Sequence, residues 1–300
     1  MNLLLTGAFN YTEEQIEKLS NLGFQIYYIQ NESEELPIQP EEIDAVVCNG
    51  LFLYHDIKKF VRLKYIQLTS AGFDRVPIDY IRKQGIKIFN AKGVYSIPMA
   101  EWVLFRALEC YKNADFFKEK QKKHLWEKNR HLKELFGKRV AIVGAGNIGQ
   151  EVGKRFQAFG CKTFGFDVHS FEADGLDCVC LISELDAYLP DFDIIVLTLP
   201  LTDETYHLFN YARFELMKEG SLLMNISRGS VINESDLVRF LSEKQRITAI
   251  LDVFEEEPLP VSSKLWEFDN VLLSPHNSFV GEGNASRLFD VILNNFVSNL

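Results

Sequence analysis

The sequence has 300 residues, 47% of them hydrophobic and 25% charged, with a formal net charge of -10 at pH 7. Such a composition is typical of a globular protein of about two domains. Acidic residues are dispersed along the chain, and no run of Lys and Arg is available to neutralise phosphates or anionic lipids. Nucleic-acid binding and membrane-surface binding are therefore not expected.

The amino-terminal segment MNLLLTGAF has no basic region before its short apolar run, and no stretch approaches about 18 consecutive apolar residues. We therefore expect no secretory signal, no transmembrane helix and a cytoplasmic location. The cysteines form no C-x-x-C pair, so reduced core thiols are expected and no metal site is predicted. They are Cys48, Cys110, Cys161, Cys178 and Cys180. The C-x-C pair at 178 and 180 lies in a short apolar run, which favours strand packing over metal binding.

Over the first 95 residues, short apolar runs alternate with helical patterns. Thr12 and Gln15 have the spacing of a capping box, which predicts a helix from about Thr12 to Leu22. Strands are predicted at LLLT, FQIYYI, DAVVCN, YIQLTS and IKIFN. This alternation indicates a parallel α/β sheet.

A long connecting helix is predicted after Pro98, through MAEWVLFRALECYKNADFFKEKQKKH. From Lys138 the alternation restarts with seven strands, which indicate a second, doubly wound sheet. Their sequences are RVAIVG, KTFGFD, CVCL, DIIVLTLP, SLLMNIS, ITAILDV and NVLLSPH. The last segment, residues 284–300, carries one apolar helical face that we expect to pack onto the first domain. That face contains Leu288, Val291, Ile292 and Phe296.

A G-x-G-x-x-G motif, residues 144–149, follows the strand RVAIVG and opens the helix QEVGKRFQAFG. Gly144 permits a tight turn, Gly146 lets a pyrophosphate approach the backbone, and Gly149 lets helix and strand pack closely. Asn147 and Ile148 are expected to supply backbone N–H groups. The motif in this context predicts a dinucleotide-binding domain of the Rossmann type.

The next strand, KTFGFD, ends in Asp167, 18 residues after Gly149, which is close to the interval expected for a ribose-binding acid. A carboxylate there accepts hydrogen bonds from the ribose hydroxyls and repels a 2′-phosphate. We therefore predict NAD rather than NADP as the cofactor. The alternative is an exposed turn aspartate that binds no ligand.

Ionisable side chains follow three successive strands of the second sheet. Arg228 follows SLLMNIS, the acidic run 255–257 follows ITAILDV, and His276 ends NVLLSPH. Each alone is compatible with a surface residue, but the carboxyl ends of parallel strands open onto one crevice. Arg, Glu and His are the types needed to oxidise an alcohol beside a carboxylate, so we predict a catalytic centre.

The other histidines are expected to be structural or surface residues. Two of them, His55 and His207, are expected to start helical stretches. Two alternatives stay open for this pair: that His55 faces the cleft and that His207 lies near the cofactor. The remaining three are His124, His131 and His169.

With these residues in view, the sequence resembles the D-isomer-specific 2-hydroxyacid dehydrogenases, in a short form similar to phosphoglycerate dehydrogenases without a regulatory domain. The similarity runs from LTSAGFD to PHNSF and includes GKRVAIVGAGNIGQ, LTLPLTDETYHL, MNISRGSVINESDL and LDVFEEEPLP. The resemblance implies a flavodoxin-like substrate domain, residues 1–97 and 282–300, and a Rossmann NAD-binding domain, residues 98–281. It also implies an active site between the domains and a homodimer formed by helices near the start of the second domain.

The resemblance further implies that Arg228 binds the substrate carboxylate and 2-oxo group, that His276 exchanges the proton, and that Glu257 supports His276. Glu255 and Glu256 are then expected to be solvated neighbours. The implied cofactor-cleft positions are Pro200, Thr205 and Asp252, and the implied substrate-binding positions are Ala71, Gly72 and Arg228.

We therefore predict an NAD-dependent oxidoreductase that moves a hydride between NAD(H) and C2 of a small D-2-hydroxy acid or 2-oxo acid. Two alternatives stay open: an NADH-binding, corepressor-like sensor without turnover, and a formate dehydrogenase, which has no use for proton exchange at His276. Residues 277–279, Asn-Ser-Phe, depart from the small apolar residues of many members. The chain stops near residue 300 with no regulatory extension, so the serine-pathway role of a 3-phosphoglycerate dehydrogenase is not expected, although short versions of that enzyme exist. Residues 51–54, LFLY, are compatible with a substrate-facing wall or with core packing.

Overall fold

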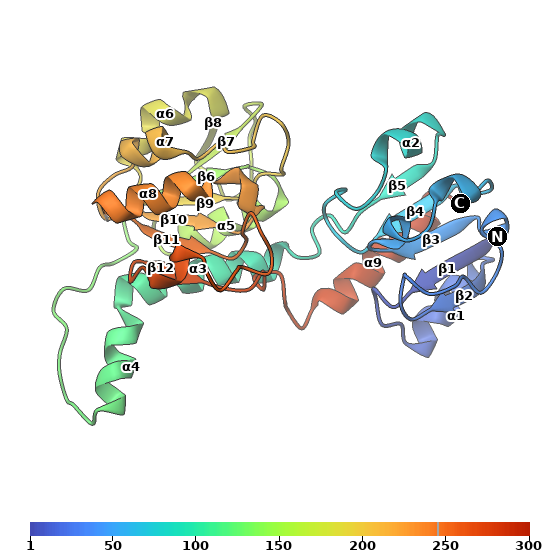
Figure 1. The fold of residues 1–300 in the computed structure, drawn as a ribbon, viewed down its shortest axis with the longest axis horizontal. Coiled ribbons are helices and arrows are strands. Elements are labelled where there is room, and N and C mark those ends of the chain that lie inside the picture. Colours follow the sequence, from blue (N-terminus) through green and yellow to red (C-terminus); the bar gives the residue numbers. More distant parts are fainter. Residues whose placement is uncertain (245) are drawn as a thin grey trace. The chain divides into compact units, whose positions relative to one another are not determined.

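The structure is a computed structural model that describes residues 1–244 and 246–300. The chain forms two compact units (Figure 1), of which the first contains Met1–Tyr95 and Gly281–Leu300 and the second contains Ser96–Val280. Each unit is built on one sheet in which every pair of neighbouring strands is parallel. The predicted fold class, two parallel α/β sheets, is confirmed.

The first unit contains a five-stranded sheet with the order β2-β1-β3-β4-β5, which is the flavodoxin-like order. Its strands are β1 Asn2–Thr6, β2 Gln25–Ile29, β3 Ala45–Cys48, β4 Tyr65–Leu68 and β5 Lys87–Phe89. Its α-helices are α1 Glu13–Asn21, α2 Ile78–Lys83 and α9 Asn284–Val297. All five predicted strands are present.

Two helices of this unit follow directly from sequence signals. At the start of α1 the Thr12 hydroxyl accepts from Gln15 N at 3.3 Å and the Gln15 side chain accepts from Thr12 N at 3.0 Å, so the predicted capping box is formed. The apolar face of α9 packs into the core of the first unit, where Phe296 is fully buried against Phe24. Burying such a side chain contributes about 1.5–3 kcal/mol to stability.

The second unit contains a seven-stranded sheet with the order β12-β11-β10-β9-β6-β7-β8. Its strands are β6 Arg139–Val143, β7 Lys162–Asp167, β8 Cys178–Leu181, β9 Ile194–Leu197, β10 Leu222–Asn225, β11 Thr248–Leu251 and β12 Val271–Leu273. The chain runs outward in one direction from β6 to β8 and in the other from β9 to β12. Ligands of doubly wound sheets bind at the carboxyl ends of the strands beside such a reversal, here between β6 and β9.

The α-helices of this unit are α3 Ser96–Lys112, α4 Ala114–Lys122, α5 Asn147–Ala158, α6 Leu185–Tyr188, α7 Tyr211–Leu216 and α8 Glu234–Lys244. Helix α5 packs against β6, β7 and α3. In one core cluster, Ala141 and Val143 of β6 meet Phe214 of α7 and Phe240 of α8. The alternation of side chains along β6 thus buries both of its faces.

The prediction of one long helix after Pro98 is wrong. The chain is broken at Asn113, which has a left-handed φ of 49° that no helix interior accommodates, so α3 and α4 are separate helices. Helix α3 also begins earlier, at Ser96. Pro98 is tolerated in its first turn because the N–H that proline lacks has no intrahelical acceptor there. Figure 1 shows α4 standing out from the rest of its unit.

The expectation of core thiols holds only in part. Cys48 and Cys161 are buried, Cys110 and Cys180 are half-buried, and Cys178 is exposed because β8 lies at the edge of its sheet. The sulfur atoms of Cys178 and Cys180 lie 3.9 Å apart, so the pair shares one strand face as predicted. Among the described residues, no helix combines the length and the apolar character needed to cross a membrane.

Candidate functional site

The site residues predicted in the second unit lie at one edge of its sheet. Because all seven strands are parallel, their carboxyl ends point to the same edge. In chain order, this edge presents Gly144 after β6, Asp167 at the end of β7, Pro200 after β9, Arg228 after β10, Asp252 after β11 and His276 after β12. The fold thus gathers residues that are far apart in the sequence.

The glycine loop between β6 and α5 has the shape that a dinucleotide requires. Gly144 has a φ of 106°, and a Cβ there would lie 2.9 Å from the backbone of Leu199; a Cβ on Gly149 would lie 2.2 Å from Gly144 O. A Cβ on Gly146, in contrast, would meet nothing within 4 Å, which leaves the approach to the backbone open. The first N–H groups of α5, at Asn147 and Ile148, have no intrahelical acceptor and suit a phosphate.

Asp167 joins the end of β7 to this loop. Its carboxylate accepts hydrogen bonds from Ala145 N at 2.9 Å and from Val168 N at 2.8 Å, and the residue is half-buried. A carboxylate has about four acceptor positions, so these two bonds leave capacity for ribose hydroxyls. The predicted ribose-binding acid and the glycine loop therefore form one pre-organised unit.

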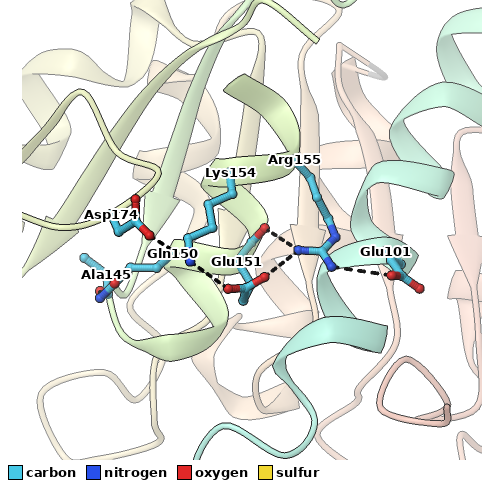
Figure 2. A network of polar contacts seen from close by, with 7 residues as sticks. All are labelled: Glu101, Ala145, Gln150, Glu151, Lys154, Arg155 and Asp174. Carbon is cyan, nitrogen blue, oxygen red and sulfur yellow. Dashed lines mark hydrogen bonds and ion pairs between the residues drawn. The ribbon is translucent and has the colours of Figure 1, made fainter. Parts of the chain in front are cut away.

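A network of polar contacts holds α5 in place behind the loop (Figure 2). The Gln150 side chain donates to Ala145 O at 3.1 Å, Lys154 bridges Glu151 and Asp174, and Arg155 bridges Glu151 and Glu101 of α3. The Arg155 guanidinium, followed by the Lys154 ammonium, holds the pKa of the Glu151 carboxyl below its ordinary value. Exposed pairs of this kind contribute at most about 1 kcal/mol each, so the network orients the helix more than it stabilises the fold.

We expect Gly146→Ala to weaken NADH binding about 10-fold, or about 1.4 kcal/mol, without loss of thermal stability. The added methyl meets no protein atom but occupies the side from which a pyrophosphate approaches. Isothermal titration with NADH and thermal unfolding measure the two effects. Gly23→Ala, at a φ of 88° and in open space, is the control that strains the backbone in the other unit. Unchanged NADH affinity in Gly146→Ala would contradict the assignment of the loop.

The segment after β9 is held by its own side chains. The Thr205 hydroxyl donates to Pro200 O at 2.7 Å and accepts from Thr202 N at 2.7 Å, and Thr205 is buried. Thr205 therefore shapes the loop. The expectation that His207 starts a helical stretch is wrong, since its φ is 51°. Its ring stacks on the ring of Tyr206, with the two ring centroids 3.9 Å apart.

His55 also does not start a helix, since it follows a short 3-10 turn, residues 51–53. Its Nε2 lies 2.9 Å from the backbone oxygen of Glu32. In the preceding segment, Leu51 is buried, whereas Leu53 and Tyr54 are largely exposed. Leu51 therefore packs in the core, whereas Leu53 and Tyr54 do not.

The predicted catalytic pair is in direct contact. His276 Nδ1 lies 2.8 Å from Glu257 Oε2, and the second oxygen of Glu257 accepts from Phe254 N at 3.0 Å. A carboxylate in this position accepts the proton of Nδ1–H, which fixes the tautomer and leaves Nε2 for a reacting group. His276 has a φ of 49°, an unfavourable conformation for a non-glycine residue that persists only where its surroundings impose it.

Asp252 provides those surroundings. Its backbone oxygen accepts from His276 N at 2.7 Å. Its buried carboxylate accepts from the Ser274 hydroxyl at 2.6 Å and from the N–H groups of Asn277 and Ser278, each at 2.9 Å. Asp252 thus fixes the residues on both sides of His276. Sequence reasoning missed the part played by Ser274, and no sequence signal marks it.

Arg228 is presented by a turn that is packed tightly against the loop of Glu257. Asn225 accepts from the Ser227 hydroxyl at 2.7 Å and donates to Arg228 O at 2.9 Å. A Cβ on the next residue, Gly229, would lie 1.8 Å from the carbonyl carbon of Phe254. Only glycine permits this approach. The structure thereby brings Arg228 and the segment that carries Glu257 onto neighbouring strand ends.

The two glutamates expected to be solvated neighbours of Glu257 are both exposed, but Glu255 also has partners within the unit. Its carboxylate accepts from Glu234 N at 3.1 Å and lies 2.8 Å from His207 Nε2. Glu256 is exposed, as expected.

The substrate-binding residues predicted in the first unit follow β4. Ala71 O accepts from the Asn90 side chain at 2.6 Å and Gly72 O accepts from the Ser70 hydroxyl at 3.0 Å. Within residues 1–244 and 246–300, no acceptor is bonded to the N–H groups of Ala71 and Gly72. The turn therefore presents the donors that its predicted role needs.

Known proteins are similar over nearly the whole chain. Residues 104–278 match the D-isomer specific 2-hydroxyacid dehydrogenase, NAD binding domain. A glyoxylate reductase of Thermofilum pendens is 31% identical, over 91% of this chain and 85% of that protein. A D-3-phosphoglycerate dehydrogenase of Methanocaldococcus jannaschii is 33% identical, over 92% of this chain and 53% of that protein.

A solved structure has the same fold. It is that of a D-isomer specific 2-hydroxyacid dehydrogenase family protein from Aeromonas salmonicida, which is 29% identical, with 99% of this chain and 94% of that chain covered and a TM-score of 0.82.

Proposed function

Since the chain belongs to the D-isomer specific 2-hydroxyacid dehydrogenase family, we propose that it transfers a hydride between NAD(H) and C2 of a small D-2-hydroxy acid or 2-oxo acid. The observation that carries the assignment of roles is the 2.8 Å contact between His276 Nδ1 and Glu257 Oε2. This contact lies at the sheet edge where the glycine loop also opens. The glyoxylate reductase relative supports a small 2-oxo acid as the substrate.

The bound cofactor supplies or accepts the hydride through its nicotinamide ring. His276 moves the proton that accompanies it: Nε2 accepts the hydroxyl proton during oxidation and returns it to the carbonyl oxygen during reduction. Glu257 stabilises the imidazolium that forms, because its carboxylate stays 2.8 Å from Nδ1. The NAD(H) cofactor is held by the glycine loop and by Asp167.

Arg228 orients the substrate. A guanidinium donates two parallel hydrogen bonds to a carboxylate or to a carboxylate and the neighbouring oxo group. The backbone N–H groups of Ala71 and Gly72 are proposed as further donors to the substrate carboxylate, since glycine permits a close approach.

The experiment that tests the function follows NADH oxidation with a panel of 2-oxo acids: glyoxylate, pyruvate, hydroxypyruvate, 2-oxoisocaproate, phenylpyruvate and 3-phosphohydroxypyruvate. We expect turnover with at least one small 2-oxo acid and, in reverse, with the D isomer of its 2-hydroxy acid. Tight NADH binding without turnover on any acid would favour the sensor. NAD⁺ reduction by formate alone would indicate a formate dehydrogenase.

We expect Asp167→Asn to raise the ratio of kcat/KM with NADPH to kcat/KM with NADH about 10-fold, or about 1.4 kcal/mol. Asparagine keeps an oxygen to accept from Ala145 N but removes the charge that repels a 2′-phosphate. Initial rates with both cofactors measure the ratio. Glu172→Gln, an exposed residue of the following loop, is the control. An equal ratio in Asp167→Asn and wild type would assign cofactor selection to another residue.

We also propose a homodimer, formed through α4 and the residues that follow it. Trp126 is 97% exposed and lies beside the exposed side chains of Leu125 and Phe117. An apolar group of this kind on a projecting arm is typical of a surface that a partner covers (Figure 1). The expected partner is a second copy of the chain.

We expect Trp126→Asp to convert the dimer to a monomer in sedimentation velocity experiments, because a buried, unpaired carboxylate in an interface is costly. Val261→Asp is the control, since Val261 is 98% exposed elsewhere in the same unit. A wild-type protein that sediments as a monomer would contradict the proposal.

A cytoplasmic location is proposed as well. All five cysteines are free thiols, which is usual for proteins of reducing compartments. Fractionation of the source cells would test it.

A further inference from the structure

The position of Glu257 depends on a short turn that has few bonds of its own. Glu257 reaches back to Phe254 N at 3.0 Å, which closes the turn, residues 254–257, but does not attach it to the rest of the unit. His276 approaches from another strand end. The 2.8 Å contact between the two side chains therefore requires that neighbouring elements hold the turn.

The first of these elements is the start of α8. Glu255 N donates to the Glu234 carboxylate at 2.5 Å, and Glu234 N donates to the Glu255 carboxylate at 3.1 Å. The two glutamates thus exchange backbone and side-chain bonds in both directions. Glu234 is the first residue of α8, so its N–H has no intrahelical acceptor and the helix end favours a negative charge.

The second element is the segment after β9. His207 Nε2 lies 2.8 Å from the same Glu255 oxygen that accepts from Glu234 N, and His207 Nδ1 lies 3.3 Å from the Asn233 side chain. Backbone bonds fix His207 in turn, since its N–H donates to Ser230 O at 2.7 Å. A second histidine–glutamate contact therefore lies two residues before the one that is proposed to act in proton transfer.

Burial and neighbouring carboxylates both act on the Glu234 side chain. Burial raises the pKa of the Glu234 carboxyl above its ordinary value, and the nearby charges of Glu255 and Glu257 raise it further. The carboxyl groups of Glu234, Glu255 and Glu257 thus lie near one another, and His207 Nε2 lies 2.8 Å from Glu255. The close packing of Gly229 on Phe254 leaves the turn little room to move away.

We propose that Glu234, Glu255 and His207 form a positioning clamp that fixes the turn 254–257 so that Glu257 meets Nδ1 of His276. The effect of the clamp on turnover rests on the proposed function, whereas its effect on the His276 ring does not. The three residues do not contact the reacting atoms. They act through Glu257.

The test compares two substitutions at Glu234. Methionine has similar length but removes the acceptor for Glu255 N, whereas glutamine keeps an acceptor oxygen. We expect Glu234→Met to lower kcat about 10-fold, with KM for NADH unchanged, and Glu234→Gln to stay within about 2-fold of wild type. Glu256→Met is the matched control, since Glu256 is an exposed glutamate of the same turn and lies between the two that the clamp involves.

A second readout does not need turnover. The ¹⁵N shifts of the His276 ring, assigned against His276→Ala and recorded at pH about 9, where an ordinary imidazole is neutral, report the tautomer. We expect the Nδ1–H form to dominate in wild type and Glu234→Gln, and both tautomers to be populated in Glu234→Met. If the wild type turned over no acid, the proposed function would fail. The ring shifts would still show whether Glu234 controls the tautomer of His276.

His207→Asn is the second variant, in case Glu234→Met does not fold. Asparagine tolerates the left-handed φ of 51° at this position but is too short to reach Glu255. We expect a fall in kcat of about 3-fold and partial mixing of the His276 tautomers. Ring shifts equal to wild type in the folded variants, even with a lower kcat, would overturn the inference.

Discussion

His276→Ala is expected to lower kcat/KM for the best 2-oxo acid about 1,000-fold, equivalent to about 4.1 kcal/mol of transition-state stabilisation. The imidazole is the proposed proton donor to the carbonyl oxygen, and Glu257 stands 2.8 Å behind it to stabilise the charged form. Without the ring, water must replace a positioned acid. Steady-state rates with NADH measure the loss.

The dissociation constant for NADH should stay within about 2-fold of wild type in this variant, because we propose that the glycine loop and Asp167 hold the cofactor. His131→Ala is the control, since His131 is exposed and lies in the segment between α4 and β6, not at the carboxyl end of a strand. A His276→Ala enzyme with nearly unchanged kcat/KM would mean that another group exchanges the proton.

Arg228→Lys is expected to lower kcat/KM about 100-fold, or about 2.7 kcal/mol, with most of the effect in KM for the 2-oxo acid. Lysine keeps the positive charge but offers a point charge instead of a planar fork, so it cannot donate two parallel bonds to the substrate. The turn that presents the residue is fixed by Asn225 and Gly229 and should persist. Kinetics at varied 2-oxo acid concentration measure the change.

The matched control is Arg239→Lys. Arg239 is an exposed arginine of α8 that forms an ion pair with Asp236, three residues earlier, and lies over the ring of Tyr211. We expect it to have wild-type kinetics. Equal kinetic constants in Arg228→Lys and wild type would remove Arg228 from substrate binding, while leaving the roles of His276 and Glu257 to be judged separately.

The sequence by itself determined the architecture, because its signals are local. The alternation of apolar runs and helical patterns predicted both parallel sheets, and the spacing of Thr12 and Gln15 predicted the start of α1. The glycine spacing also predicted the tight packing at Gly144 and Gly149. Side chains at the ends of parallel strands meet at one edge whatever the details of the loops, so Arg228 and His276 could be grouped in advance.

Local sequence signals did not predict where a helix ends or whether a strand lies at the edge of its sheet. The helical pattern continues across Asn113, but the backbone there is left-handed and separates α3 from α4. Cys178 lies in an apolar run that is typical of a core strand, yet β8 is at the edge of the sheet and leaves it exposed. Sequence periodicity does not report the place of a strand within its sheet.

Only the tertiary structure decided what each residue of the acidic run contacts. Glu255, Glu256 and Glu257 are equivalent in composition and spacing, and only the family resemblance singled out Glu257. In the fold, Glu257 meets His276, Glu255 meets Glu234 and His207, and Glu256 faces solvent. These partners lie about 20 to 50 residues away along the chain and come from different strand ends. Their distances depend on how the backbones pack, as at Gly229, and no local pattern encodes that packing.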